Sequence, residues 1–167
     1  SNRGGGACYD FSTFYEIQKV AKANQLALHL DGARVFNAIV HKKENAADYG
    51  KVFDSVSICL SKGLGAPVGS VLVGSIPFIK KARRWRKVLG GGMRQAGYLA
   101  AAGIYAIENH VARLADDHLH AIALKEALES KSFVDHVLPV ETNIVIAVMT
   151  GAYTPAAFVQ ALKEQNI

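Results

Sequence analysis

The sequence predicts an α/β protein built on a mostly parallel sheet. A helical pattern over Phe11–Asn24 is followed by the short apolar run Leu26–Leu30, and this alternation is typical of parallel sheets. A second apolar run, Val52–Leu60, ends in the same way at a polar turn. The chain has 167 residues, half of them hydrophobic, which is enough for an ordinary domain with a core.

The first half of the chain is expected to alternate helices and strands. The first helix has an apolar stripe of Phe14, Ile17, Val20 and Ala21, and Asp10 or Ser12 can cap it. In chain order we predict a helix, a strand, a short helix, a polar connection and a second strand, at Phe11–Asn24, Leu26–Leu30, Arg34–Val40, His41–Tyr49 and Val52–Leu60.

A tight turn separates the second strand from a third. Gly63–Gly69 contains Pro67 and three glycines, which favour a turn. Ser70–Gly74 reads as a short strand. A helix then begins at Ser75-Ile76-Pro77, because proline is tolerated in the first turn, and it extends to about Leu89.

The second half changes character after a long helical stretch. Met93–Ser130 is helical in pattern, with a bend expected at Asn109-His110, where two lobes could join. We expect one domain over residues 1–112 and the start of a second over 113–167. The second should contain two strands and a helix capped by Thr154-Pro155, with the strands at Val137–Val140 and Asn143–Met149.

The net charge of +5 is concentrated in one segment, IKKARRWRKV at Ile79–Val88. A basic run with an embedded tryptophan is found in nucleic-acid-binding proteins, but no motif of a nucleic-acid module accompanies it. A helix with a solvated basic face, or one facing an anionic ligand or a neighbouring subunit, explains the run better. We therefore expect no nucleic-acid partner.

Cysteine usage and hydropathy indicate a cytoplasmic protein. Cys8 and Cys59 lie far apart in the sequence, which suits a reducing compartment and does not match a zinc motif, so we expect no metal site. No window is long and apolar enough to cross a bilayer, and the N-terminus lacks the layout of a signal peptide. A membrane partner is not expected.

Two ionisable residues stand where apolar runs end, Asp31 after LALHL and Lys62 after VSICLS. Ligands of open parallel sheets bind at the carboxyl ends of the strands, so the two charges are candidates for one site. A confined lysine can form a Schiff base with an aldehyde, and pyridoxal phosphate (PLP) needs such a lysine together with a carboxylate at its pyridine nitrogen. Arg34 could bind a carboxylate at the same edge.

Three blocks of the sequence resemble the low-specificity threonine aldolases, a PLP-dependent family with the aspartate-aminotransferase fold (fold type I). They are HLDGAR at His29–Arg34, SVSICLSKGLGAPVGSVLVG at Ser55–Gly74 and KVLGGGMRQAG at Lys87–Gly97. NRGGG near the start also fits. The resemblance implies part of a large PLP-binding domain with a mixed, mostly parallel sheet, followed by the start of a small α+β C-terminal domain.

The resemblance also implies roles for individual residues. Lys62 would hold pyridoxal 5′-phosphate as a Schiff base, Asp31 would pair with the pyridine nitrogen, and Arg34 would bind the substrate carboxylate. Lys87 and Arg94 resemble basic residues near the family's active site, where subunits meet, although solvated charges are an equal explanation. His29 shares a face with Asp31 and is expected to pack or to hydrogen-bond rather than to catalyse.

The implied reaction is cleavage of the Cα–Cβ bond of L-threonine or L-allo-threonine to glycine and acetaldehyde, in a homotetramer built from dimers. The chain resembles only the middle and later part of the family, without the segment that binds the cofactor phosphate. We therefore expect these 167 residues to be inactive, or nearly so, without further polypeptide. A companion polypeptide could supply that segment.

Three other functions compete with the aldolase. One is a β-eliminating PLP lyase of the same fold acting on an aromatic amino acid or cysteine. Another is a nucleotide-binding module using Gly63–Gly69, although this spacing misses the dinucleotide fingerprint and no Walker pattern occurs. The third is a non-catalytic interaction domain that uses the basic helix.

Overall fold

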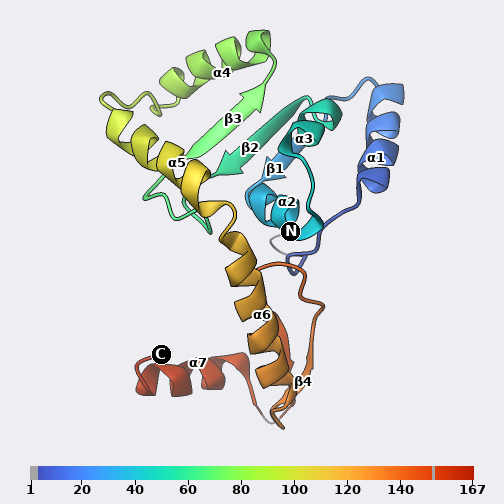
Figure 1. Cartoon of the computed structure of the whole chain (residues 1–167), viewed down its shortest axis with the longest axis vertical. Helices are drawn as coiled ribbons and strands as arrows, with labels where there is room; N and C mark the ends of the chain where they lie inside the picture. Colours follow the sequence, from blue (N-terminus) through green and yellow to red (C-terminus); the bar gives the residue numbers. More distant parts are fainter. Residues whose placement is uncertain (1–3, 152) are drawn as a thin grey trace. The chain divides into compact units, whose positions relative to one another are not determined.

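A three-stranded mixed sheet forms the centre of the larger of two units. The computed structural model describes residues 4–151 and 153–167. β1 (His29–Gly32) runs parallel to β2 (Ser55–Cys59), and β3 (Ser70–Gly74) runs antiparallel to β2 (Figure 1). A parallel pair needs a crossover, and α2 (Val35–Lys42) and α3 (Ala46–Val52) supply it.

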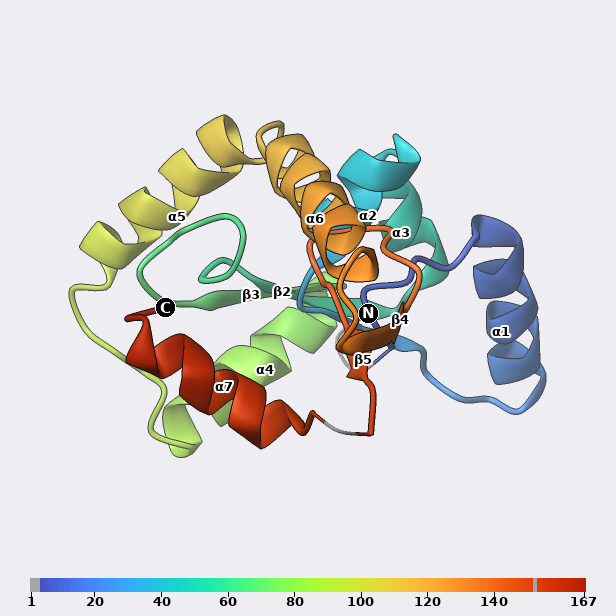
Figure 2. The same cartoon turned by 90° about the horizontal axis from the view of Figure 1, so that it is seen from below.

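The two faces of this sheet differ in chemistry. Alternation along β2 puts Ser55, Ser57 and Cys59 on one face and Val56 and Ile58 on the other. The apolar face packs against α2 and α3. Figure 2 shows these two helices and α5 (Gly97–His110) on one side of the strands, with α4 (Ile76–Val88) on the other.

Two adjoining clusters make up the core of this unit. The first gathers buried side chains of α1 (Phe11–Ala23), α2, α3, the residue after α3, and β2: Phe14, Val35, Tyr49, Val52, Phe53 and Val56. The second lies beyond the end of β2 and consists of Leu60, Leu64, Ala66, Ala106 and Leu114. The second cluster therefore anchors the loop that follows β2.

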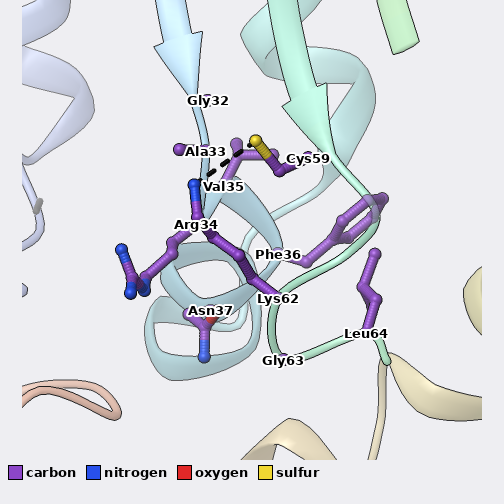
Figure 3. A pocket seen from close by; sticks show the side chains of 10 residues that line it. All are labelled: Gly32, Ala33, Arg34, Val35, Phe36, Asn37, Cys59, Lys62, Gly63 and Leu64. Carbon is purple, nitrogen blue, oxygen red and sulfur yellow. Dashed lines mark hydrogen bonds between the residues drawn. The ribbon is translucent and has the colours of Figure 1, made fainter. Parts of the chain in front are cut away.

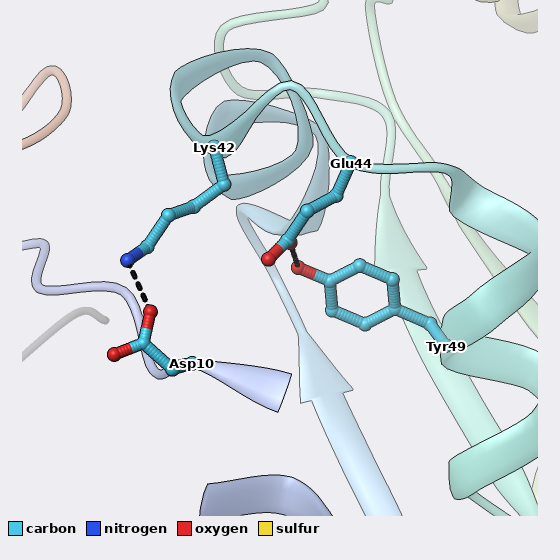
Figure 4. Close-up of polar contacts among 4 residues, drawn as sticks. All are labelled: Asp10, Lys42, Glu44 and Tyr49. Carbon is cyan, nitrogen blue, oxygen red and sulfur yellow. Dashed lines mark hydrogen bonds and ion pairs between the residues drawn. The ribbon is translucent and has the colours of Figure 1, made fainter. Parts of the chain in front are cut away.

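Polar contacts reinforce the first cluster at its edge (Figure 4). The Tyr49 hydroxyl donates to Glu44 Oε2 at 2.6 Å, and Lys42 Nζ lies 2.6 Å from Asp10 Oδ1. Tyr49 is 5% exposed, so its hydroxyl needs this partner inside the protein. The two contacts connect the N-terminal end of α1 and the segment between α2 and α3 to one core.

The smaller unit combines the described residues of Ser1–Ala7 with Asp116–Ile167. It contains most of α6 (Leu114–Glu129), the antiparallel pair β4 (Val134–Val137) and β5 (Ala147–Met149), and α7 (Pro155–Glu164). The larger unit is Cys8–Ala115. Within the described ranges, no helix has the length and apolar character needed to cross a membrane.

The N-terminal segment is joined to this smaller unit by a buried hydrogen bond. Thr142 Oγ1 donates to the Gly6 carbonyl at 2.9 Å, and Thr142 is 2% exposed. Gly6 has a φ of +81°, and a Cβ there would lie 2.5 Å from Thr142 Oγ1. Asn2 and Arg3, which belong to the NRGGG block, lie outside the described residues.

Several predicted elements differ in extent from the observed ones. The expected polar connection His41–Tyr49 contains the start of α3, which Asn45 caps by accepting from Ala47 N at 2.9 Å. The first strand is His29–Gly32 instead of Leu26–Leu30, because pairing with β2 begins at His29. The long pattern over Met93–Ser130 is two helices, α5 and α6, and the first ends at His110, where the bend was predicted.

Candidate active site

Asp31 and Lys62 are positioned by the parallel pairing of β1 and β2. Asp31 lies opposite Ser57, and Lys62 follows the end of β2 at Cys59 by three residues. Paired residues of neighbouring strands project to the same face, and residues two apart on one strand share a face. Asp31, Ser57 and Cys59 therefore stand on one face of the sheet, at its carboxyl-end edge.

The Lys62 side chain returns toward that same face. Lys62 Nζ donates to Cys59 Sγ at 3.4 Å (Figure 3), and Ser70 Oγ of β3 donates to the same sulfur at 3.6 Å. Lys62 itself is exposed, so the described residues do not confine its amine as the sequence suggested. The thiol is a weak acceptor, and the contact orients the amine without burying it.

Asp31 is exposed, and its Oδ1 accepts from Ala33 N at 3.2 Å. Two positions earlier on the same face, His29 Nδ1 and Ser55 Oγ lie 2.8 Å apart. His29 is thus a hydrogen-bonding residue, as the sequence predicts. His29 and Asp31 of β1 thus lie beside Ser55 and Ser57 of β2 on the same polar face of the sheet.

Gly32 brings the chain close to β2 immediately after Asp31. A Cβ at Gly32 would lie 2.7 Å from the Ser57 carbonyl oxygen and 3.2 Å from Val56 Cγ1. No side chain fits there, which is the physical reason for glycine after the aspartate. The close approach lets α2 begin directly at the strand end, with the half-buried Arg34 as the residue before its first turn.

Arg34 and Lys62 line the same small hollow at the strand ends. Its walls come from the start of α2 and the loop after β2: Gly32, Ala33, Arg34, Val35, Phe36, Asn37, Cys59, Lys62, Gly63 and Leu64. Asp31 is not in this lining. The volume is about 10 Å³, room for about one water molecule. At this edge of the sheet the described residues therefore leave no cavity large enough for a cofactor.

Lys87 and Arg94 are not part of this hollow. Lys87 lies in the last turn of α4. Its side chain packs against Gly92, where an added Cβ would lie 2.6 Å from Lys87 Cδ. Arg94 is exposed in the connection between α4 and α5. The structure therefore brings Asp31, Arg34 and Lys62 to one edge of the sheet and leaves these two elsewhere on the same unit.

Sequence reasoning missed two partners of the Lys62 loop. Cys59 could have been found, because alternation along the second strand puts it on the face of Asp31. His110 could not: its Nδ1 lies 2.6 Å from the Leu64 carbonyl oxygen, a contact between residues 46 positions apart. Within the described ranges, no group of three His, Cys, Asp or Glu side chains is placed to hold a metal ion.

Comparison with known proteins identifies the family. The family model of the beta-eliminating lyases matches residues 1–152. Low specificity L-threonine aldolase of Escherichia coli K12 is 47% identical over 152 residues, covering 91% of this chain and 45% of that protein. Low-specificity L-threonine aldolase 1 of Arabidopsis thaliana is 46% identical over 142 residues, covering 84% of this chain and 40% of that protein.

A solved structure agrees with these matches. A protein from an Exiguobacterium species, described as an aromatic amino acid beta-eliminating lyase/threonine aldolase, superposes with a TM-score of 0.78 at 29% identity. The match covers 87% of this chain and 41% of that one. It confirms the predicted fold class, the α/β fold of the PLP-dependent fold-type-I enzymes. The chain spans less than half the length of these relatives, and it belongs to the beta-eliminating lyase family.

Proposed function

We propose that this chain is part of a PLP-dependent aldolase that cleaves the Cα–Cβ bond of L-threonine or L-allo-threonine to glycine and acetaldehyde. One observation carries the proposal. Asp31 lies on one face of the sheet at its carboxyl-end edge, and the Lys62 amine contacts the sulfur of Cys59, which lies on that same face. The similarity to two low-specificity L-threonine aldolases supports the choice of substrate.

The donor set at this edge fits pyridoxal 5′-phosphate. Lys62 offers an accessible amine for a Schiff base, and Asp31 offers a carboxylate for the protonated pyridine nitrogen. When bound, the cofactor would accept the electron pair that is released as a bond to Cα breaks. Arg34, on the wall shared with Lys62, would hold the substrate carboxylate and so fix which bond at Cα is presented.

Further roles follow from the same proposal. Lys87 and Arg94 would contribute basic charge near a substrate site where subunits meet. The unit Cys8–Ala115 would represent part of the large PLP-binding domain, and residues Asp116–Ile167 of the smaller unit the start of the small C-terminal domain. The enzyme would act in the cytoplasm, in threonine catabolism and glycine biosynthesis, as a homotetramer. Cys8 and Cys59 are not joined in a disulfide, which suits that compartment.

The activity would require more polypeptide than these residues. The chain spans 45% of the Escherichia coli relative, and the hollow beside Lys62 has room for about one water molecule. Additional walls, from a longer chain or from a companion polypeptide, would complete the cofactor site. We expect the 167-residue chain alone to release little or no glycine from L-threonine, and robust turnover would contradict this.

Reductive trapping tests the cofactor lysine directly. The longest polypeptide encoded by the gene is mixed with pyridoxal 5′-phosphate and reduced with borohydride, and the adduct is located by peptide mass spectrometry. We expect the adduct mainly on Lys62, absent in Lys62→Arg and unchanged in the matched control Lys80→Arg on the exposed helix α4. An adduct spread evenly over the lysines of α4 and Lys62 would refute the assignment.

Product analysis tests the reaction. The longest polypeptide encoded by the gene is incubated with L-threonine, and glycine and acetaldehyde are measured in equal amounts. A second candidate, β-elimination from an aromatic amino acid or cysteine, is favoured by the description of the matching family and of the Exiguobacterium structure. Pyruvate and ammonia from those amino acids, without acetaldehyde from threonine, would select it.

A further inference from the structure

The position of the Lys62 amine depends on the backbone of its loop, because the side chain is exposed and its one described polar contact is a weak thiol acceptor. Three backbone hydrogen bonds shape that loop. Leu60 N donates to Gly69 O at 3.0 Å, Ala66 N to Leu60 O at 3.0 Å, and Gly65 N to Lys62 O at 2.8 Å. These bonds close the loop on itself, but they do not attach it to the rest of the unit.

The side chain of Leu64 supplies one attachment. Leu64 is 3% exposed and packs in the second core cluster with Ala106 of α5 and with Leu114. An apolar contact of this kind is not directional. It holds the loop against α5 without setting the direction of the Leu64 carbonyl, and the bond from Gly65 N constrains that peptide only relative to Lys62.

His110, the last residue of α5, supplies the directional attachment. Its Nδ1 lies 2.6 Å from the Leu64 carbonyl oxygen. A carbonyl oxygen only accepts, so Nδ1 must carry the hydrogen and donate it. The same ring lies beside Gly65, where a Cβ would be 3.6 Å from Nδ1, and Tyr105 stacks edge-on against it at a centroid distance of 5.4 Å.

This arrangement fixes the left-handed part of the loop. Gly65 has a φ of +73°, and its amide is bonded to the Lys62 carbonyl. The peptide that His110 holds is the one between Leu64 and Gly65, so His110 sets the plane next to the left-handed residue. The same peptide carries the Gly65 amide, which is bonded to the Lys62 carbonyl, so its orientation affects the backbone at Lys62.

We propose that His110 is a positioning residue for Lys62: it fixes the loop backbone through the Leu64 carbonyl and thereby the direction of the amine. The proposal rests on the proposed role of Lys62 as the cofactor lysine. Without the His110 hydrogen bond, the loop samples further backbone conformations, and the fraction in which the amine faces the polar face of the sheet falls.

The test compares His110→Phe with His110→Asn. Phenylalanine keeps a ring against Tyr105 and Gly65 but has no donor, whereas asparagine places its amide nitrogen where Nδ1 stood. His120→Phe, at an exposed position on α6, is the control for the substitution itself. Thermal unfolding of each variant checks that the fold is kept; if the Phe ring does not fit, His110→Ala replaces it.

Two readings are taken on the longest polypeptide encoded by the gene, which carries these substitutions. The first is hydrogen exchange of the peptide that carries the Leu60, Gly65 and Ala66 amides. The second is the rate of the borohydride-trapped pyridoxal 5′-phosphate adduct on Lys62, divided by the rate on Lys80. In His110→Phe we expect about tenfold faster exchange and an about tenfold lower ratio, the effect of losing one hydrogen bond. His110→Asn should stay within about threefold of the unaltered chain in both readings.

Each outcome decides one proposal. If His110→Phe leaves both readings unchanged, or changes the exchange but not the Lys62 ratio, His110 does not position Lys62. If the unaltered chain shows no preference for Lys62 over Lys80, the proposed role of Lys62 fails, and the exchange reading alone decides whether His110 holds the loop. Equal loss in the Phe and Asn variants would assign the effect to packing and overturn the role of the donor.

Discussion

Tyr49 is a single residue in which burial and hydrogen bonding act in the same direction. Its side chain is in the first core cluster, and its hydroxyl donates to Glu44 Oε2 at 2.6 Å. Burial raises the pKa of Tyr49 well above its usual value, and the hydrogen bond to the Glu44 carboxylate and the charge of that group raise it further. The neutral phenol is therefore favoured in the folded state over the unfolded state.

The raised pKa of Tyr49 predicts a loss of stability at alkaline pH. The stabilisation is complete below the unfolded pKa of about 10 and declines as the pH rises toward the higher folded pKa. At pH 8, Tyr49→Phe should lower the free energy of unfolding by about 1 kcal/mol, because Glu44 loses its donor. Urea unfolding at pH 8 and pH 11 should show the difference between variant and unaltered chain shrinking or reversing at pH 11.

The control for this experiment is Tyr98→Phe, because Tyr98 is 89% exposed. Its free energy of unfolding should equal that of the unaltered chain at both pH values. A difference between Tyr49→Phe and the unaltered chain that stays constant from pH 8 to pH 11 would contradict the raised pKa of Tyr49.

At the scale of elements, the pairing of β1 with β2 determines where the candidate site forms. The register sets Asp31 opposite Ser57, and Gly32 permits the close approach that ends β1. A side chain at Gly32 would collide with the backbone of β2, which cannot rotate away. The same close approach brings Arg34 to the wall that contains Lys62.

The tight contact at Gly32 predicts opposite effects for two glycine-to-alanine substitutions. Gly32→Ala should lower the free energy of unfolding by about 1–3 kcal/mol, because the new methyl group overpacks against the Ser57 carbonyl. Gly50→Ala, inside α3 with nothing within 4 Å, should raise it by about 0.5–1 kcal/mol. Urea unfolding of both variants checks this; equal effects would contradict the contact.

The sequence predicts elements better where the signal is local. Proline and serine placed the start of α4 correctly, since Ser75 caps the helix by accepting from Phe78 N. α3 was missed because its residues AADYGKV include a glycine and follow a polar stretch, and its stability comes from burying Tyr49 and Val52. The start of β1 was misplaced because the partner strand, not apolar character, decides where a strand begins.

The candidate site was likewise predictable only where local sequence signals determine it. Asp31 and Lys62 were assigned to one edge because both follow apolar runs, and strand ends of a parallel pair coincide. The exposure of Lys62 and the small volume of the hollow were not predictable, since they depend on what else packs at that edge. The contact from His110 requires the return of α5 to the loop, which no local pattern encodes.

At the scale of the whole molecule, strand β3 is the most exposed part of the sheet. Within the described residues it pairs with β2 alone. Its apolar side chains remain open to solvent, with Val71 42%, Leu72 39% and Val73 47% exposed. An exposed apolar edge strand is a template for pairing with another chain.

The open edge predicts self-association that a charge should suppress. Val73→Lys should lower the light scattering of the concentrated chain severalfold, because lysine on an edge strand opposes strand addition. Val20→Lys, at a 61% exposed position of helix α1, is the matched control and should leave the scattering unchanged. Equal suppression by both variants would indicate a general effect of charge instead of pairing at β3.

The bond between Thr142 and Gly6 has a consequence for anyone who shortens this polypeptide. The glycine-rich opening resembles a dispensable tail, yet it furnishes the acceptor for a hydroxyl 136 positions further along. Trimming it would leave the buried Thr142 hydroxyl without this acceptor, and the loss of stability would affect the β4–β5 pair, remote in sequence from the cut.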